Sequence, residues 1–321
     1  MRFYDIFNGD ADGLCALHQL RLADPRTATL ITGVKRDIGL LARVTPEPGD
    51  ELTVLDVSLD TNREALLGAL RIGARVRYFD HHFAGEMPHH RLLEAHIDTA
   101  ATVCTSLIVD RHLQGHYRAW AVVAAFGDNL RAQAYSAASG LGLATAEVEA
   151  LRELGECLNY NAYGQELADL HFDPAELYLR MRPFADPLAF HAQSPEIEVL
   201  RRASAQDLQQ ALALRIENIG NSAVMVIMPD AAWSRRITGT FANALARRHG
   251  DRIVALLLRS GAGYQVSLRG PEHGGPAMHL LAQAFESGGG RARSAGIQFL
   301  PESDVARLMA LLARPSATAP D

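Results

Sequence analysis

The chain has 321 residues, of which 48% are hydrophobic, and it carries a formal net charge of −6. No apolar run approaches the ~20 residues that a membrane-spanning helix needs, and the N-terminus opens on a strand-like segment instead of a signal peptide. The acidic balance argues against tight, nonspecific binding to long duplex DNA. We therefore expect a cytoplasmic globular protein that makes no membrane association and is large enough for two domains.

Strand-like and helical segments alternate at the start of the chain. Apolar or alternating runs predict strands over residues 2–7, 28–34, 51–57 and 74–80, and helical periodicity predicts helices over 14–22 and 61–70. Thr61 and Glu64 have the spacing of a capping box at the start of the second helix. This order predicts a mostly parallel sheet with helices on both faces.

The pattern becomes helical between about residues 100 and 180, and a second α/β segment follows a proline-containing stretch and a long predicted helix over 198–219. The strands expected in that segment cover 222–228, 251–258 and 263–270, and the helices cover 239–249 and 277–285. We expect an α/β catalytic domain over 1–182, a helical linker over 183–218, a smaller α/β domain over 219–314 and a disordered tail over 315–321.

Acidic residues and histidines follow the predicted strands at the points where each strand ends. They are Asp10 and Asp12 after the first strand, Asp56 after the third, and Asp80, His81 and His82 after the fourth, with Asp128 in a later "GDN". Because the carboxyl ends of parallel strands meet at one edge of a sheet, we expect these side chains to lie together. Taken alone, Asp10 and Asp12 are equally compatible with a polar turn that caps a helix.

So many carboxylates in one place raise one another's pKa unless cations or protons neutralise them. Carboxylate and imidazole ligands suit Mn²⁺, Mg²⁺ or Zn²⁺, whereas the scattered Cys15, Cys104 and Cys157 lack metal-ligand spacing. Two such ions about 3.5–4 Å apart can activate a water and clamp a phosphoryl group. The sequence therefore predicts a two-metal centre for phosphoryl chemistry.

The C-terminal part of the chain combines glycines with arginines. A glycine run lets backbone N–H groups approach an anion closely, although a flexible loop is the alternative, and arginine can bind phosphate through two parallel hydrogen bonds. The residues that we expect to hold substrate are Ser267, Arg269, Gly288, Gly289, Gly290 and Arg291.

Two further features are left open by the sequence. Lys35 is the only lysine in the chain, which biased genome composition explains better than function does. The polar and aromatic segment "NYNAYG" at residues 159–164 fits a cleft between domains and a buried helix end equally well.

These motifs together resemble those of the DHH phosphoesterase family, which includes RecJ-type exonucleases, nano-RNases and cyclic-dinucleotide phosphodiesterases. Over about residues 4–130, "NGDADG", "LDVS", "DHH" and "GDN" resemble the four motifs of its catalytic domain, in order. Over about residues 220–300, "GTFANALARR", "YQVSLRG" and "GGGRARSAG" resemble the DHH-associated C-terminal domain.

The resemblance implies a ligand set for two divalent metal ions, for which Mn²⁺ is expected and Mg²⁺ is the alternative. Asp10 would bind the first ion and Asp12 the second, and Asp56 would bridge the two. His81 and Asp128 would complete the second site.

The resemblance also implies catalytic roles for the DHH motif itself. His82 would face the phosphate of the substrate. Asp80 would orient a histidine from behind, and His81 would serve both as ligand and as part of the catalytic motif.

Two positions depart from the family's pattern. Asn8 stands where many members carry His or Asp, and its amide oxygen would be a weaker, uncharged ligand for the first ion. Arg291 stands where members usually carry a histidine after the glycine run. Arginine donates to phosphate at any pH but cannot shuttle a proton.

We expect a metal-dependent phosphodiesterase or exonuclease that hydrolyses short single-stranded oligonucleotides or nucleotides. The chain lacks room for the extra oligonucleotide-binding domain of large RecJ-type enzymes, which favours substrates of a few nucleotides. A phosphohydrolase for small phosphate esters or cyclic dinucleotides and a catalytically reduced nucleotide-binding sensor stay open as alternatives. The sequence does not distinguish RNA from DNA or fix the cleavage polarity, and it is compatible with a homodimer.

Overall fold

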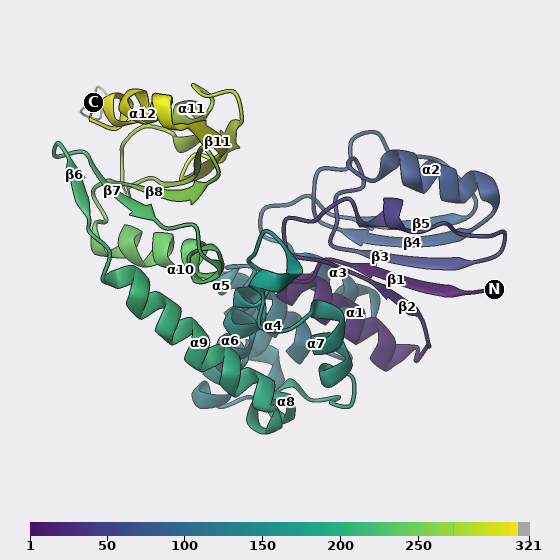
Figure 1. The fold of residues 1–321 in the computed structure, drawn as a ribbon. Coiled ribbons are helices and arrows are strands. Elements are labelled where there is room, and N and C mark those ends of the chain that lie inside the picture. The colour runs from purple at the N-terminus through teal and green to yellow at the C-terminus, as the bar shows by residue number, and fades with distance from the viewer. Residues whose placement is uncertain (272, 314–321) are drawn as a thin grey trace. The chain divides into compact units, whose positions relative to one another are not determined.

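The computed structural model describes residues 1–271 and 273–313, so the predicted disordered tail lies outside the described residues. The chain forms two compact units, Met1–Arg202 and Ala203–Asp321. Each unit combines a β-sheet with helices (Figure 1). The predicted α/β class is confirmed in both units.

The N-terminal unit contains a five-stranded sheet in which every neighbouring pair of strands is parallel, in the order β2-β1-β3-β4-β5. Its strands are β1 (Phe3–Phe7), β2 (Thr29–Ile31), β3 (Glu51–Leu55), β4 (Arg75–Asp80) and β5 (Leu93–Ile97). Successive strand residues point to opposite faces of the sheet. Figure 1 shows α2 (Arg63–Ile72) on one face and α1 (Ala11–Ala23) and α3 (Thr105–His112) on the other.

The face under α2 is apolar. Alternate strand residues such as Ile6, Val54 and Tyr78 pack there with Leu66 and Leu70 of the helix. Burial of these side chains supplies the main favourable free energy of this layer. The sheet is thereby held rigid, and the ends of its strands become fixed points for functional residues.

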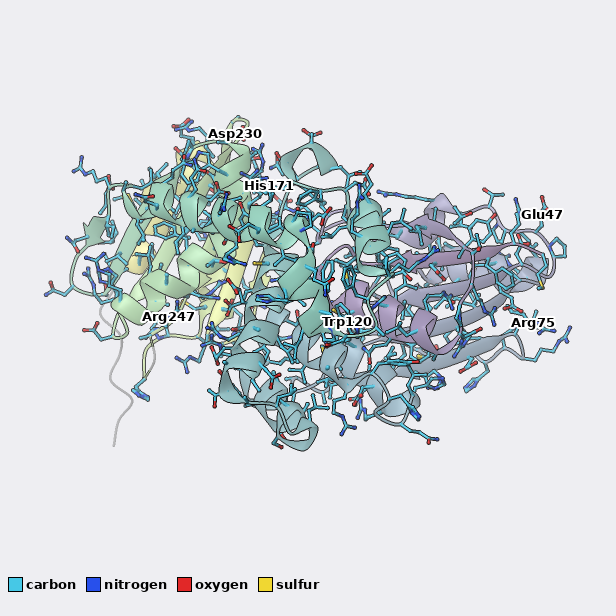
Figure 2. The ribbon with its side chains drawn as sticks, turned by 90° about the horizontal axis from the view of Figure 1, so that it is seen from below. Glu47, Arg75, Trp120, His171, Asp230 and Arg247 are labelled. Carbon is cyan, nitrogen blue, oxygen red and sulfur yellow. The ribbon has the colours of Figure 1, made fainter. Side chains whose placement is uncertain are left out.

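Further helices complete the N-terminal unit beside α1. They are α4 (Arg118–Gly127), α5 (Arg131–Ala138), α6 (Thr145–Tyr160), α7 (Pro174–Met181) and α8 (Pro187–Gln193), followed by α9 (Pro195–Leu212), which runs on into the second unit. Figure 2 labels Trp120 within this helical layer. Trp120 is fully buried, and its indole Nε1–H donates to the Ala185 carbonyl at 2.9 Å. Its ring lies 4.5 Å from that of His18 of α1, measured between centroids.

The C-terminal unit contains a six-stranded mixed sheet in the order β10-β11-β9-β8-β7-β6, in which only β7 and β8 pair in parallel among the described residues. Its strands are β6 (Glu217–Ile219), β7 (Ala223–Met228), β8 (Ile253–Ser260), β9 (Gly263–Arg269), β10 (Gly288–Gly290) and β11 (Ser294–Pro301). Its helices are α10 (Ala232–Arg248), α11 (Met278–Ala282) and α12 (Val305–Leu312). Met278 and Leu308 pack with Met225, Leu257 and Val266 of the strands to form its core.

Short 3₁₀ helices connect some of these elements at η1 (Leu40–Arg43), η2 (Ser139–Leu141), η3 (Leu167–Asp169) and η4 (Glu302–Asp304). Within the described residues, no helix has both the length and the apolar character that crossing a membrane requires. The three cysteines are buried and unpaired.

Two predictions about local structure are wrong. The capping box of Thr61 and Glu64 does not form, because α2 starts one residue later with Asn62 at the N-cap. The Asn62 side chain instead bonds the η1 segment, accepting from the Leu41 amide at 3.1 Å and donating to the Ile38 carbonyl at 2.7 Å. Tertiary hydrogen bonds therefore override the local capping signal.

The long helix predicted over 198–219 ends at Leu212, and Glu217–Ile219 forms strand β6. This segment pairs with β7 in antiparallel register, with Glu217 opposite Met225. Pairing with β7 satisfies the backbone hydrogen bonds of this segment. The helical pattern of the local sequence does not reveal that partner. Strands β5 and β11 and helices α5 and α12 were not predicted.

Candidate metal centre

Four buried acids gather at the carboxyl ends of the parallel strands. Asp10, Asp12, Asp56 and Asp80 are each no more than 2% exposed. Figure 2 labels Arg75 at the other end of the sheet, where β4 begins. The predicted edge therefore exists, and the topology of the sheet explains why residues far apart in the chain meet there.

Asp10 lies at the junction of β1 and α1. Its Oδ1 accepts from the Asp12 and Gly13 amides at 3.0 Å each, so it is the N-cap of α1. A Cβ on Gly13 would come within 2.1 Å of the Asn8 carbonyl oxygen, which explains the glycine that follows the two acids. Capping and a place in the acidic edge, weighed above as alternatives, are both true of Asp10.

Asp12 is anchored by the start of a different helix. Its two carboxylate oxygens accept from the Thr105 and Ser106 amides at 2.7 Å each. These amides belong to the first turn of α3, where unpaired N–H groups favour an anion. The Thr105 hydroxyl also donates to Oδ1 of Asp56 at 3.0 Å. Sequence reasoning missed Thr105 and Ser106, although Ser and Thr at the start of a predicted helix are a signal for such contacts.

Asp56 carries the clearest sign of strain. Its φ is +58°, in the left-handed region that Asp tolerates better than most residues. Burial, followed by the carboxylates of Asp12, Asp10 and Asp128, raises the pKa of Asp56 well above its ordinary value. An added cation would reverse this balance and favour the charged carboxylate.

The DHH motif presents its two imidazoles in different ways. Nδ1 of His81 lies 2.8 Å from the Val103 carbonyl, to which it donates, so Nε2 is left with a free lone pair 3.4 Å from Oδ1 of Asp56. Nδ1 of His82 lies 2.7 Å from Oδ1 of Asp80. Burial alone would lower the pKa of His82, but the hydrogen bond and charge of Asp80 raise it above its ordinary value.

Lys35 reaches this edge from the loop after β2. Its Nζ donates to Oδ2 of Asp10 and lies 3.3 Å from Oδ1 of Asn159 and 3.5 Å from Oδ1 of Asp128. Burial opposes the charge of Lys35, but Asp10 and its neighbours outweigh that effect and raise the pKa of Lys35 well above its ordinary value. Burial likewise opposes the charge of Asp10, and Lys35 lowers the pKa of Asp10 overall. Sequence reasoning missed this role, although a single lysine in the chain was the available signal.

The metal-ligating side chains at this edge form two overlapping groups that share His81. One ligand atom each from Asp12, His81 and Asp128 lie within 4.8 Å of one another, and the same holds for Asp56, His81 and His82. Three carboxylates and a neutral imidazole nitrogen are ligands that Mn²⁺ accepts.

The side chains expected to bind a first ion, Asn8 and Asp10, already have other partners. Oδ1 of Asn8 accepts from the Asp10 amide at 3.2 Å, and its Nδ2 donates to the Lys35 carbonyl at 3.0 Å. Both polar atoms of Asn8 therefore bond backbone groups, and the ammonium of Lys35 contacts Oδ2 of Asp10.

A further group of donors lies where β5 meets the C-terminal end of α3. One ligand atom each from Glu94, His96 and His112 lie within 4.8 Å of one another. The Arg77 guanidinium lies 3.4 Å from the Glu94 carboxylate and 3.1 Å from Nε2 of His112. Arg77 therefore already supplies a positive charge to this group.

The glycine run of the C-terminal unit is an edge strand. Gly288, Gly289 and Gly290 form β10 and pair with β11 in antiparallel register. A Cβ on Gly288 would lie 1.8 Å from the Ala282 carbonyl oxygen, so the strand needs glycine to approach α11. The Arg291 amide donates to the Ser294 carbonyl at 2.7 Å and closes the hairpin.

A cavity of about 420 Å³ lies on this sheet. Ser267, Gly288 and Gly289 line it together with the side chains of Gln265 and Gln298. The other residues expected to hold substrate lie outside its lining. Arg291 is exposed, and Nε of Arg269 donates to Oδ1 of Asn243 of α10 at 2.9 Å.

Known proteins resemble this chain in their fold. No family model and no curated protein sequence matches the chain. A crystal structure of exonuclease RecJ bound to manganese is similar with a TM-score of 0.60 and 16% identity, covering 97% of this chain and 89% of that one. RecJ from Thermus thermophilus in complex with Mn²⁺ has a TM-score of 0.62 and 18% identity, covering 98% of this chain and 52% of that one.

A pGpG-specific phosphodiesterase, PggH from Vibrio cholerae, is similar with a TM-score of 0.56 and 14% identity, covering 97% of each chain. The chain therefore has the fold of the DHH phosphoesterases, and the resemblance drawn from its motifs is confirmed at the level of the fold.

Proposed function

We propose that the chain is a metal-dependent phosphodiesterase that hydrolyses short single-stranded oligonucleotides or linear dinucleotides. The observation that carries this proposal is a pair of donor groups at one edge of the parallel sheet that share His81. One contains Asp12 and Asp128, and the other contains Asp56 and His82. Mn²⁺ is the ion that best suits this mixture of carboxylate and imidazole. A divalent ion held there would supply the positive charge that polarises a phosphoryl group and makes water a better nucleophile.

The residues of the DHH motif prepare the site for that substrate. Val103 fixes the tautomer of His81, so that its Nε2 faces the acids. Asp80 favours the protonated form of His82, whose side chain is 42% exposed. We propose that the imidazolium of His82 donates a hydrogen bond to a phosphate oxygen, where charge develops during hydrolysis.

The C-terminal unit offers polar and cationic groups suited to a nucleotide. We propose that the cavity lined by Ser267 and Gly289 holds a terminal nucleotide and that Arg291 binds a phosphate. Its volume, about 420 Å³, is within the range of small-molecule sites, which favours a substrate of few nucleotides. The similarity in length and fold to the pGpG-specific phosphodiesterase supports the same choice.

The test uses the full chain stripped of metal with a chelator and then supplied with Mn²⁺. We expect hydrolysis of pGpG and of short 5′-labelled RNA and DNA, followed by chromatography of the products, to give mononucleotides and to slow with substrate length. Cleavage of cyclic dinucleotides or small phosphate esters in preference to these would favour the phosphohydrolase alternative. Nucleotide binding without any hydrolysis would overturn the proposal in favour of a sensor.

A further inference from the structure

The single lysine of the chain is placed where several segments of the N-terminal unit converge. Its ammonium contacts Asp10 of the β1–α1 junction and lies near Asp128 at the end of α4 and Asn159 of α6. It also lies 5.7 Å from the centre of the Tyr163 ring, within the range of a cation–π interaction. Two residues of the segment "NYNAYG", Asn159 and Tyr163, therefore lie against the Lys35 ammonium.

The backbone of Lys35 is held from both sides. Its amide donates to the Ala162 carbonyl at 2.9 Å, and its carbonyl accepts from Nδ2 of Asn8 at 3.0 Å. The loops that carry Asn8 and Lys35 touch closely, since a Cβ on Gly9 would lie 2.1 Å from the Gly33 carbonyl oxygen. The Lys35 side chain thus extends from a fixed backbone toward the acids and is only 27% exposed.

The charges at the edge fall into two groups. Oδ2 of Asp10 is bonded by the charged ammonium of Lys35, whereas the oxygens of Asp12 are bonded by uncharged backbone amides. Within the described part of the chain, no cationic side chain lies as close to the acids around His81 as Lys35 lies to Asp10. The one approach among the described residues is that of Lys35 Nζ to Oδ1 of Asp128, at 3.5 Å. A divalent ion bound to Asp10 would have to lie within a few Å of the ammonium, and that repulsion opposes its binding.

We infer that this centre binds one divalent ion per chain, at Asp12, Asp56, His81 and Asp128, and that the ammonium of Lys35 supplies the positive charge beside Asp10 in place of another ion. The inference rests on the proposed function for its purpose, because the ion and the ammonium together would place positive charge beside the phosphate and the acids around it. Asn8 serves in this arrangement as a support for the Lys35 loop. Lys35 then acts through a positive charge that its backbone contacts hold in place.

The test measures metal content rather than activity. Equilibrium dialysis and calorimetry of the full chain with Mn²⁺ should give one ion per chain, with the hyperfine spectrum of an isolated Mn²⁺. Lys35→Met, which keeps the length of the side chain without its charge, should admit a second ion. Lys35→Arg, which keeps the charge, should remain at one.

Two tightly bound ions in the wild-type protein, or none, would overturn the inference whether or not the variants fold. A Lys35→Met variant that folds and still binds only one ion would overturn it as well. Hydrolysis of pGpG is measured on the same samples to separate the two proposals. One ion without hydrolysis would reject the proposed function alone, whereas hydrolysis with two ions would reject the inference and leave the proposed function standing.

Discussion

The two units of the molecule bury different kinds of residue. Among the described residues, all but two of the buried polar or charged side chains belong to the N-terminal unit, the exceptions being Asp207 and Ser234. The core of the C-terminal unit is formed by aliphatic and aromatic residues, and most of its arginines are exposed or half-buried at the surface. The first unit therefore holds polar and charged groups inside its core, whereas the second presents them at its surface.

Buried polar groups must be paired to be tolerated. In the N-terminal unit they are paired by helix starts, as at Asp12, and by cations, as at Asp5 and Asp10. Oδ2 of Asp80 is an exception, since it is buried without a partner within the described part of the chain. This unpaired oxygen lies in the DHH motif, close to the proposed metal centre.

Removing the charge of Asp56 should lower kcat more than any other change considered, while the first unit keeps its fold. Asn tolerates the left-handed backbone at position 56, so Asp56→Asn should fold while losing about 10³-fold or more in kcat, or about 4 kcal/mol of barrier stabilisation. Its midpoint of urea unfolding should stay the same or rise, because one carboxylate fewer relieves repulsion. Steady-state kinetics on pGpG with Mn²⁺ provides the measurement.

Asp60→Asn is the matched control, since Asp60 is a half-exposed acid of the same unit. It should leave kcat unchanged. An Asp56→Asn protein with normal turnover would contradict the assignment of Asp56 to the metal centre.

The second prediction concerns the stability of the first unit. Arg21 and Asp5 form an ion pair with side chains only 5% and 2% exposed, and Arg21 also donates to the Thr53 hydroxyl at 3.0 Å. Arg21→Met leaves Asp5 buried without its partner and should lower the free energy of unfolding by about 3–5 kcal/mol. In a Trp233→Phe background, Trp120 fluorescence during urea unfolding reports this unit alone.

Arg111→Met removes the exposed ion pair with Asp98 and serves as the comparison. It should cost less than about 1 kcal/mol. Equal losses for the two variants would mean that the buried pair contributes no more than a surface pair.

A third prediction uses pH to probe the buried polar groups of α1. Burial lowers the pKa of His18 from 6.5 to about 4, although Nε2 bonds the Phe184 carbonyl, and Nδ1 has no partner among the described residues. Between these pH values the unfolded chain binds a proton that the folded chain does not. Stability is therefore full above pH 6.5 and falls as pH decreases, by about 3 kcal/mol at pH 4.

His18→Phe is less stable at neutral pH, because the Phe184 carbonyl loses its donor, but it lacks this titration. The difference in free energy of unfolding between wild type and variant should therefore shrink as pH falls from 6.5 to 4. A difference that stays constant with pH would show that His18 does not titrate in this way.

The smallest expected effect concerns substrate binding in the second unit. Arg291 is exposed, so Arg291→Ala should leave stability unchanged and mainly raise KM, lowering kcat/KM by roughly 10- to 150-fold for a charge-assisted contact. Arg291→Lys should recover part of the loss. Arg247→Ala, at an exposed position on α10 (Figure 2), is the control and should leave KM unchanged. An unaltered KM in Arg291→Ala would show that the phosphate of the substrate is bound by other residues.

Much of the acidic edge could be predicted from sequence because its residues follow strands, and parallel topology then brings strand ends together. Lys35, Asn159 and Thr105 could not be predicted in the same way, since they lie far apart in the chain and meet only in the folded unit. The glycine run pairs with β11 as a strand, and its expected role as an anion-binding segment stays a prediction. That pairing depends on contacts outside the local sequence.

We propose that the acidic edge of the first unit is a divalent-metal centre. Anomalous diffraction at the manganese edge, from crystals of the full chain soaked in Mn²⁺, tests it most directly. We predict one strong peak per chain within bonding distance of ligand atoms from Asp12, Asp56, His81 and Asp128, with the Lys35 ammonium beside it. A map with no peak there, or with its main peak between Glu94, His96 and His112, would contradict the claim.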